Sequence, residues 1–193
     1  MLDPAAARRW LDVVEAALVA GALGRPAPPL AASLTDAEVA AGRAAVAAKF
    51  LAVGTPRSMA LIGLGELAPW IVAGQRAYAA PRELRVFEAV PVEAARTADG
   101  VGGRVGSLAE ACAADIVVAR GPVALRREWF RGGTHLTALD PGVVCDPALL
   151  AAAVVHTDGT PPPGVRVHAT LGAVAAGLVD GRQLDEITVL LAG

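Results

Sequence analysis

The stretch Ser58-Met59-Ala60-Leu61-Ile62-Gly63-Leu64-Gly65-Glu66-Leu67-Ala68 decides the fold of this chain. Its apolar run, residues 59–62, has the length and content of a buried parallel strand. A glycine turn, Gly63-x-Gly65-x-x-Ala68, closes the run, and a segment with helical spacing follows over residues 67–79. In this pattern Gly63 permits the tight turn, Gly65 lets the main chain approach a pyrophosphate, and Ala68 lets helix and strand pack closely. The order predicts a dinucleotide-binding fold, with an ordinary strand-to-helix turn as the alternative.

The composition limits the classes of protein to which the chain can belong. Hydrophobic residues make up 54% of its 193 residues and aromatic residues only 4%, so the core is expected to consist of Ala, Val and Leu. The net charge of −2 argues against binding to nucleic acid or to an anionic membrane surface. Charged residues interrupt the first 20 positions and no apolar run reaches membrane-spanning length, so we expect a soluble, cytoplasmic protein. Cys112 and Cys145 lack metal or redox spacing, and no metal site is expected.

The first third of the chain predicts two helices. Asp3 can cap a helix that begins at Pro4 and ends near Gly21. The proline-rich residues 24–30 read as a linker. A capping box, Thr35-x-x-Glu38, then begins a helix that runs to about residue 53.

The remainder of the chain alternates between strand and helix patterns, which predicts a parallel sheet covered on both faces. The fold class is therefore α/β, a Rossmann-type doubly wound sheet. Strands are expected at residues 84–88, 104–105, 116–119, 134–139 and 154–157, with helices between them, including one from the capping box Ser107-x-x-Glu110. His135 lies inside an apolar strand and is expected to be a hydrogen-bonded core histidine rather than a base.

Glu88 is the last residue of the second expected strand of the dinucleotide fold. It lies 23 positions after Gly65, close to the spacing at which an acidic residue binds the adenosine ribose. A carboxylate there favours NAD over NADP, because it repels a 2′-phosphate and Ala89 offers no compensating cation. The alternative is that Glu88 only solvates a strand end. Glu66, in the first helical turn, brings a second negative charge near the pyrophosphate.

Five stretches of the chain, in order, resemble those of one protein family. They are residues 2–26, residues 46–52, the glycine turn, residues 114–118 with 133–138, and residues 171–177 followed by 181–182 and 185–189. On these motifs the chain is identified as a member of the ornithine cyclodeaminase/mu-crystallin family. The resemblance implies a Rossmann domain, here residues 56–160, beside a substrate and dimerisation domain built from both chain ends. Residues 1–55 would be a helical remnant of that second domain, to which residues 161–193 return.

The resemblance also implies NAD or NADP as cofactor and a small amino acid or imine as substrate. Several family site residues are replaced here. The stretch with the substrate-binding lysine and arginine is almost absent between Pro29 and Thr35; another family arginine falls on Val39, although Arg43 is one turn away. The family glutamine is Leu67, its threonines appear as Ala119 and Gly121, its late lysine is Leu191, and its catalytic aspartate falls on Gly142, two positions after Asp140. Together these replacements indicate that the usual catalysis is lost or altered.

Two hypotheses follow. The first is an NAD-dependent oxidoreductase or cyclodeaminase with Asp140 as acid/base and Arg43 or Arg25 binding the substrate carboxylate. The second is a non-catalytic structural or regulatory subunit that works with a partner chain, which could also supply missing strands to a composite site. The expected cofactor is NAD rather than NADP, held by Gly63, Leu64, Gly65, Glu66, Leu67, Ala68, Glu88, Ala119 and Leu139. The second hypothesis leaves open whether it is bound.

The last apolar strand, residues 187–191, bears on association. In the resembled family it joins a sheet built largely from the N-terminal segment, most of which is missing here. We therefore expect an exposed apolar edge that a second copy or another partner covers, giving a homodimer or a hetero-oligomer.

Overall fold

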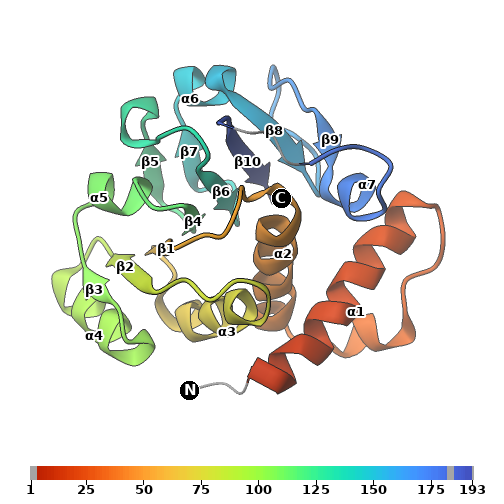
Figure 1. The fold of residues 1–193 in the computed structure, drawn as a ribbon, viewed down its shortest axis with the longest axis horizontal. Coiled ribbons are helices and arrows are strands. Elements are labelled where there is room, and N and C mark those ends of the chain that lie inside the picture. Colours follow the sequence, from red (N-terminus) through yellow and green to blue (C-terminus); the bar gives the residue numbers. More distant parts are fainter. Residues whose placement is uncertain (1–3, 182–184, 193) are drawn as a thin grey trace.

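The fold is an α/β structure built on one sheet of eight parallel strands (Figure 1). A computed structural model describes residues 4–181 and 185–192. The sheet order is β3-β2-β1-β4-β6-β10-β8-β9, and β5 and β7 form a separate two-stranded sheet. The predicted Rossmann-type fold is confirmed. Asp3, the expected cap of the first helix, lies outside the described residues.

The elements follow the predicted alternation closely. The α-helices are α1 (Pro4–Ala22), α2 (Asp36–Leu51), α3 (Ala68–Tyr78), α4 (Pro91–Val101), α5 (Leu108–Cys112), α6 (Pro147–Ala152) and α7 (Leu171–Ala175), and the 3-10 helices are η1 (Pro29–Ser33), η2 (Gly65–Leu67) and η3 (Arg127–Trp129). The strands are β1 (Ser58–Ile62), β2 (Glu83–Phe87), β3 (Arg104–Val105), β4 (Ile116–Ala119), β5 (Val123–Leu125), β6 (His135–Ala138), β7 (Val143–Cys145), β8 (Ala153–Thr157), β9 (Ala169–Thr170) and β10 (Ile187–Leu191). Both capping boxes form, at Thr35 and at Ser107.

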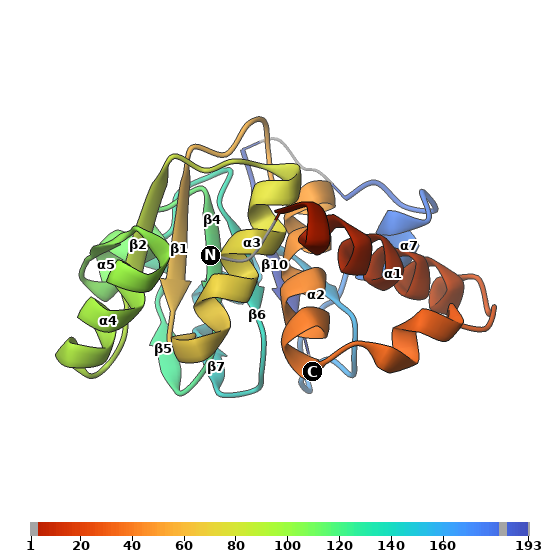
Figure 2. The ribbon, with the colours of Figure 1, turned by 90° about the horizontal axis from the view of Figure 1, so that it is seen from below.

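Helices cover both faces of the sheet. On one face, side chains of α2, α3 and α4 pack against alternate residues of β1, β2 and β4, and α7 with α2 covers Leu190 of β10. On the other face, α5 and α6 pack against the opposite residues of β1, β4, β6 and β10. Figures 1 and 2 place α1 outside this arrangement, against α2 and away from the β3 edge. None of the helices in the described part of the chain is long and apolar enough to cross a membrane.

The last strand lies inside the sheet, where the prediction of an exposed edge was wrong. β10 pairs in parallel with β6 on one side and with β8 on the other. Val189 and Leu190 are fully buried, on opposite faces. The chain therefore covers this strand with its own elements, and the edge argument for a partner chain is lost.

The end of the chain also reaches the N-terminal helices. α7 packs against α1 so closely that a Cβ atom on Gly172 would lie 2.5 Å from the carbonyl oxygen of Leu18. Residues 153–157 and 187–191 meanwhile complete the main sheet. The division at residues 55 and 160 stays a prediction, since both terminal segments share their packing with the central part. β5, β7, β9 and α7 were not predicted.

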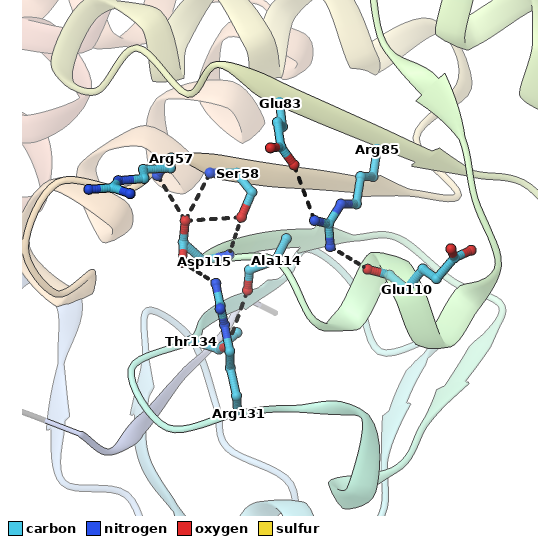
Figure 3. Close-up of polar contacts among 9 residues, drawn as sticks. All are labelled: Arg57, Ser58, Glu83, Arg85, Glu110, Ala114, Asp115, Arg131 and Thr134. Atoms are coloured by element: carbon cyan, nitrogen blue, oxygen red, sulfur yellow. Dashed lines mark hydrogen bonds and ion pairs between the residues drawn. The ribbon is translucent and has the colours of Figure 1, made fainter.

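Asp115 ties the amino ends of β1 and β4 together (Figure 3). Its Oδ2 atom accepts hydrogen bonds from the main-chain N–H groups of Arg57 and Ser58, at 2.8 Å each, and from the Ser58 hydroxyl at 2.9 Å. Its own N–H donates to Ser58 Oγ, and Oδ1 pairs with Arg131. Burial alone would raise the pKa of Asp115, but the hydrogen bonds from Ser58 and Arg57 and the charge of Arg131 outweigh it and lower that pKa. The cluster sets the register in which Met59 faces Ile116.

A charge at the centre of β10 tests its interior position. We expect Val189→Lys to lower the free energy of unfolding by about 3 kcal/mol or more, because the ammonium would be buried without a partner. Val144→Lys, at a strand residue that is 59% exposed, is the matched control and should change stability little. Urea denaturation measures both variants. Equal, small effects would show that β10 is exposed in solution.

Candidate dinucleotide site

The glycine turn lies at the carboxyl end of β1, beside β4. Gly63 has a φ of +65°, and its N–H donates a 2.9 Å hydrogen bond to the carbonyl oxygen of Phe87 at the end of β2. A Cβ atom on Gly63 would lie 2.3 Å from the carbonyl oxygen of Arg120. Only glycine fits there, since both the φ angle and the close approach of the neighbouring chain exclude a side chain.

Unlike Gly63, which lies against the main chain of Arg120, Gly65 has open space beside it. Its φ is +49°, and a Cβ atom there would have no atom of the described structure within 4 Å. Its N–H donates a 2.9 Å hydrogen bond to Oε1 of the half-buried Glu88. The open space beside Gly65 leaves room for a ligand, and the Glu88 carboxylate next to it can accept hydrogen bonds from ligand hydroxyls.

The other residues of the turn divide into buried and exposed ones. Leu64 and Ala68 are buried in the core and Leu67 packs against it, so they can offer a ligand mainly main-chain groups. Glu66 is exposed. It borders a hollow of about 300 Å³ between the start of α3 and α4, whose other lining residues are Gly65, Pro69, Arg96, Thr97 and Gly100. The Glu66 carboxylate therefore lies on the outer side of the turn.

The ends of β4 and β6 lie beside the glycine turn. From β1 the chain passes to β2 and β3 on one side, and after β3 it crosses to β4 on the other side of β1. Open α/β sheets bind ligands at such a switch point. Arg120 donates its N–H to Ile62 at 2.9 Å, and Leu139 donates to Ala119 at the same distance. These hydrogen bonds place the predicted residues Ala119 and Leu139 at the same end of the sheet as the glycine turn.

Arg120 is a site residue that the sequence reasoning missed. It follows β4 directly, its side chain is 52% exposed, and its Nε lies 3.4 Å from Oδ2 of Asp140. Its main chain contacts the glycine turn. The sequence did offer a signal for Arg120. It is a charged residue that directly follows a buried strand, and this strand neighbours β1.

Asp140 holds two loops together. Its Oδ1 atom accepts hydrogen bonds from the N–H groups of Gly121, at 3.1 Å, and Gly142, at 2.9 Å. Its other oxygen faces Arg120. The loops after β4 and β6 touch here, because a Cβ atom on Gly121 would lie 2.2 Å from the carbonyl carbon of Gly142. The carboxylate predicted as acid/base thus has a structural role in this arrangement.

The two arginines predicted to bind substrate lie apart. Arg43, in the middle of α2, pairs through Nε with Oδ2 of Asp158 at 3.0 Å, and the Asp158 side chain is only 2% exposed. Asp158 follows β8, at the same end of the sheet as the glycine turn. Arg25 is exposed on the loop between α1 and η1, which both ribbon views place at the side farthest from β3 (Figures 1 and 2).

The histidines do not form a site. His135 is fully buried, with Nδ1 2.9 Å from Thr188 Oγ1 and Nε2 3.0 Å from Thr137 Oγ1, as expected of a core histidine. Burial, followed by the nearby His156, lowers the pKa of His135 to about 3. Among the described residues, no three His, Cys, Asp or Glu side chains gather as ligands for a metal ion.

Residues 24–158 match the sequence model of the ornithine cyclodeaminase/mu-crystallin family. The chain belongs to this family. Comparison with curated proteins finds no match.

Solved structures of similar fold include three with a bound nicotinamide dinucleotide. An archaeal alanine dehydrogenase dimer with bound NAD is 21% identical with a TM-score of 0.84, over 97% of this chain and 86% of that one. The Δ1-pyrroline-2-carboxylate reductase of Thermococcus litoralis, solved with NADH and L-proline, is 20% identical with a TM-score of 0.71, over 81% and 58%. The iminosuccinate reductase of Paracoccus denitrificans in complex with NAD+ is 24% identical with a TM-score of 0.67, over 80% and 56%. This chain therefore spans less than two thirds of the last two proteins.

Removing the Asp140 carboxylate tests its structural role. We expect Asp140→Ala to lower the free energy of unfolding by roughly 1–2 kcal/mol, since the N–H groups of Gly121 and Gly142 lose their acceptor. Asp140→Asn keeps an amide oxygen in place and should lose less than half as much. Equilibrium denaturation of both variants measures the difference. If the alanine variant is as stable as the unmodified chain, the carboxylate does not hold these loops.

Proposed function

We propose that the chain binds NAD across the glycine turn, as an ornithine cyclodeaminase/mu-crystallin family protein. The observation that carries this proposal is the geometry of Gly65, whose N–H faces a carboxylate and whose Cβ position is open space. The pyrophosphate would lie on the turn between Gly63 and Ala68, and the adenosine ribose beside Glu88. The nicotinamide half would extend over Ala119 and Leu139.

The position of Glu88 supports NAD over NADP. Its carboxylate already bonds to Gly65, so one oxygen is fixed at the turn and the other is available to ribose hydroxyls. A 2′-phosphate would meet this negative charge. The next residue, Ala89, is exposed and uncharged, and Arg96, further along α4, pairs with Glu93.

For catalysis, we propose a small amino acid or imine as substrate, with the carboxylate near Arg120. When bound, NAD would accept or return a hydride. Arg120 is half exposed beside the glycine turn. Its ion pair with Asp140 is long and uses Nε, which leaves the other guanidinium N–H groups for a second carboxylate. Asp140 would then orient Arg120 rather than transfer a proton.

Two internal ion pairs favour a second candidate, a non-catalytic subunit that retains the cofactor site. Asp158 forms an ion pair with the Nε of Arg43. Asp140 accepts hydrogen bonds from two main-chain N–H groups and forms an ion pair with Arg120. Groups that would hold and activate a substrate are thus used within the chain. Such a subunit would act with a partner chain. Association as a homodimer or hetero-oligomer, and location in the cytoplasm, are further proposals.

Two titrations on one sample test the cofactor proposal. We expect NADH to bind roughly tenfold more tightly than NADPH, about 1.4 kcal/mol, because of repulsion at Glu88. Glu88→Gln should narrow this ratio, since the amide removes the charge and keeps the size. Fluorescence of the bound nicotinamide measures both constants.

Exposed Glu83, in the preceding strand, gives the matched control, Glu83→Gln, which should leave the ratio unchanged. NADPH binding as tight as NADH to the unmodified chain would contradict the specificity. Failure to bind either cofactor would contradict the proposed function.

A separate assay tests ornithine cyclisation. We expect turnover of ornithine with NAD+ far below that of a competent family member assayed in parallel, because the internal ion pairs engage the candidate substrate groups. Proline and ammonia are measured together. Comparable turnover by the chain alone would show that these groups rearrange to bind substrate.

A further inference from the structure

A second hollow lies at the opposite end of the sheet from the glycine turn. It has a volume of about 600 Å³ and is lined by Thr55, Pro56, Arg57, Ala80 and Arg82. These residues come from the loop between α2 and β1 and the loop between α3 and β2. The hollow is within the size range of small-molecule sites, and its walls are largely apolar apart from the two guanidinium groups.

The strand register places the two arginines side by side. Ser58 pairs with Glu83, so Arg57 and Arg82 occupy adjacent positions just before these strands. The N–H of Arg82 donates a 2.8 Å hydrogen bond to the carbonyl oxygen of Arg57. Neighbouring strands are about 4.8 Å apart, so two positive side chains start from adjacent points and line one hollow. Like charges in such positions destabilise one another unless an anion lies between them.

The acidic groups around the hollow are engaged elsewhere. Asp115 accepts the main-chain N–H groups of Arg57 and Ser58 and pairs with Arg131. Figure 3 shows the Arg57 side chain extending away from that carboxylate. Glu83 pairs with Arg85. No carboxylate of the described residues forms an ion pair with the guanidinium of Arg57 or Arg82.

We propose that this hollow binds a small organic phosphate monoester. Two guanidinium groups from adjacent strands can donate paired hydrogen bonds to phosphate oxygens, and the dianion would compensate both charges. The Thr55 hydroxyl offers a further hydrogen bond, and Pro56 and Ala80 give an apolar wall for the organic group. The site is separate from the glycine turn and does not depend on the proposed NAD binding.

The competing explanation is that the arginines serve the helix ends. α2 and α3 both end near this hollow, at Leu51 and Tyr78, and the partial negative charge of helix carboxyl ends attracts cations. In that case the arginines would stabilise the fold without binding any anion. The two explanations predict different results in solution.

Calorimetric titration with phenyl phosphate and with inorganic phosphate tests the proposal. We expect saturable 1:1 binding, tighter for phenyl phosphate because the apolar wall contacts the ring. Arg57→Gln and Arg82→Gln should each weaken it roughly tenfold, since each removes one charge-assisted contact. Arg9→Gln, at an exposed arginine of α1, is the matched control and should bind as the unmodified chain does.

Repeating the titration with NADH present separates this site from the glycine turn. Unchanged phenyl phosphate binding in the presence of bound NADH supports the second site. If NADH does not bind, the Arg57 and Arg82 variants locate the phosphate. Displacement by NADH would place the phosphate at the glycine turn and overturn the proposal. Absence of saturable binding, or equal binding by all three variants, would also overturn it. Lower melting temperatures of the Arg57 and Arg82 variants without phosphate binding would assign the arginines to the helix ends.

Discussion

The pairing of β1 with β4 is the constraint on which the rest of the structure depends. Asp115 fixes this pairing at the amino ends, by holding the first residues of β1 through main-chain and hydroxyl hydrogen bonds. Five residues further along, the same register brings Gly63 against the main chain of Arg120. A slip of one residue would turn every core side chain of β1 to the other face and remove the close contact at the glycine turn. The half-buried carboxylate at one end of the sheet therefore determines the geometry of the glycine turn at the other.

The carboxyl end of the sheet is closed by interactions within the chain. Asp140 joins the loops after β4 and β6, and Asp158 joins the end of β8 to α2. Removing the cation beside a buried carboxylate such as Asp158 costs far more free energy than the ion pair contributes. These contacts therefore favour a fixed arrangement. The turn itself differs, because Gly65 faces open space. The structure thus combines a preformed glycine turn with a neighbouring region whose charged groups are already paired.

The terminal segments show how a short chain can complete this fold. β10 lies between β6 and β8, and both of its faces are buried. α7 packs against α1 and α2. Val189 packs with residues of β4, β6 and α6, and Leu190 packs with Leu51 and Leu171 on the other face. Such two-sided burial explains why four of the five residues of β10 are apolar, without a partner chain to cover them.

The sequence by itself determined the local structure and the chemistry of the turn. Apolar runs between capping boxes and glycines are short-range signals, so residues 58–68, both capping boxes and the order of the main elements were predictable. Glu88 was correctly placed next to the turn because its distance from Gly65 is set by one helix and one strand. Tertiary structure alone decided the place of β10, since strand order depends on contacts between residues far apart in the chain. It also decided the partners of Asp140 and Arg43, which lie 19 residues from Gly121 and more than 100 from Asp158. Side chains that look free for catalysis in a sequence are paired here, because folding brings an opposite charge or an unbonded N–H group within reach.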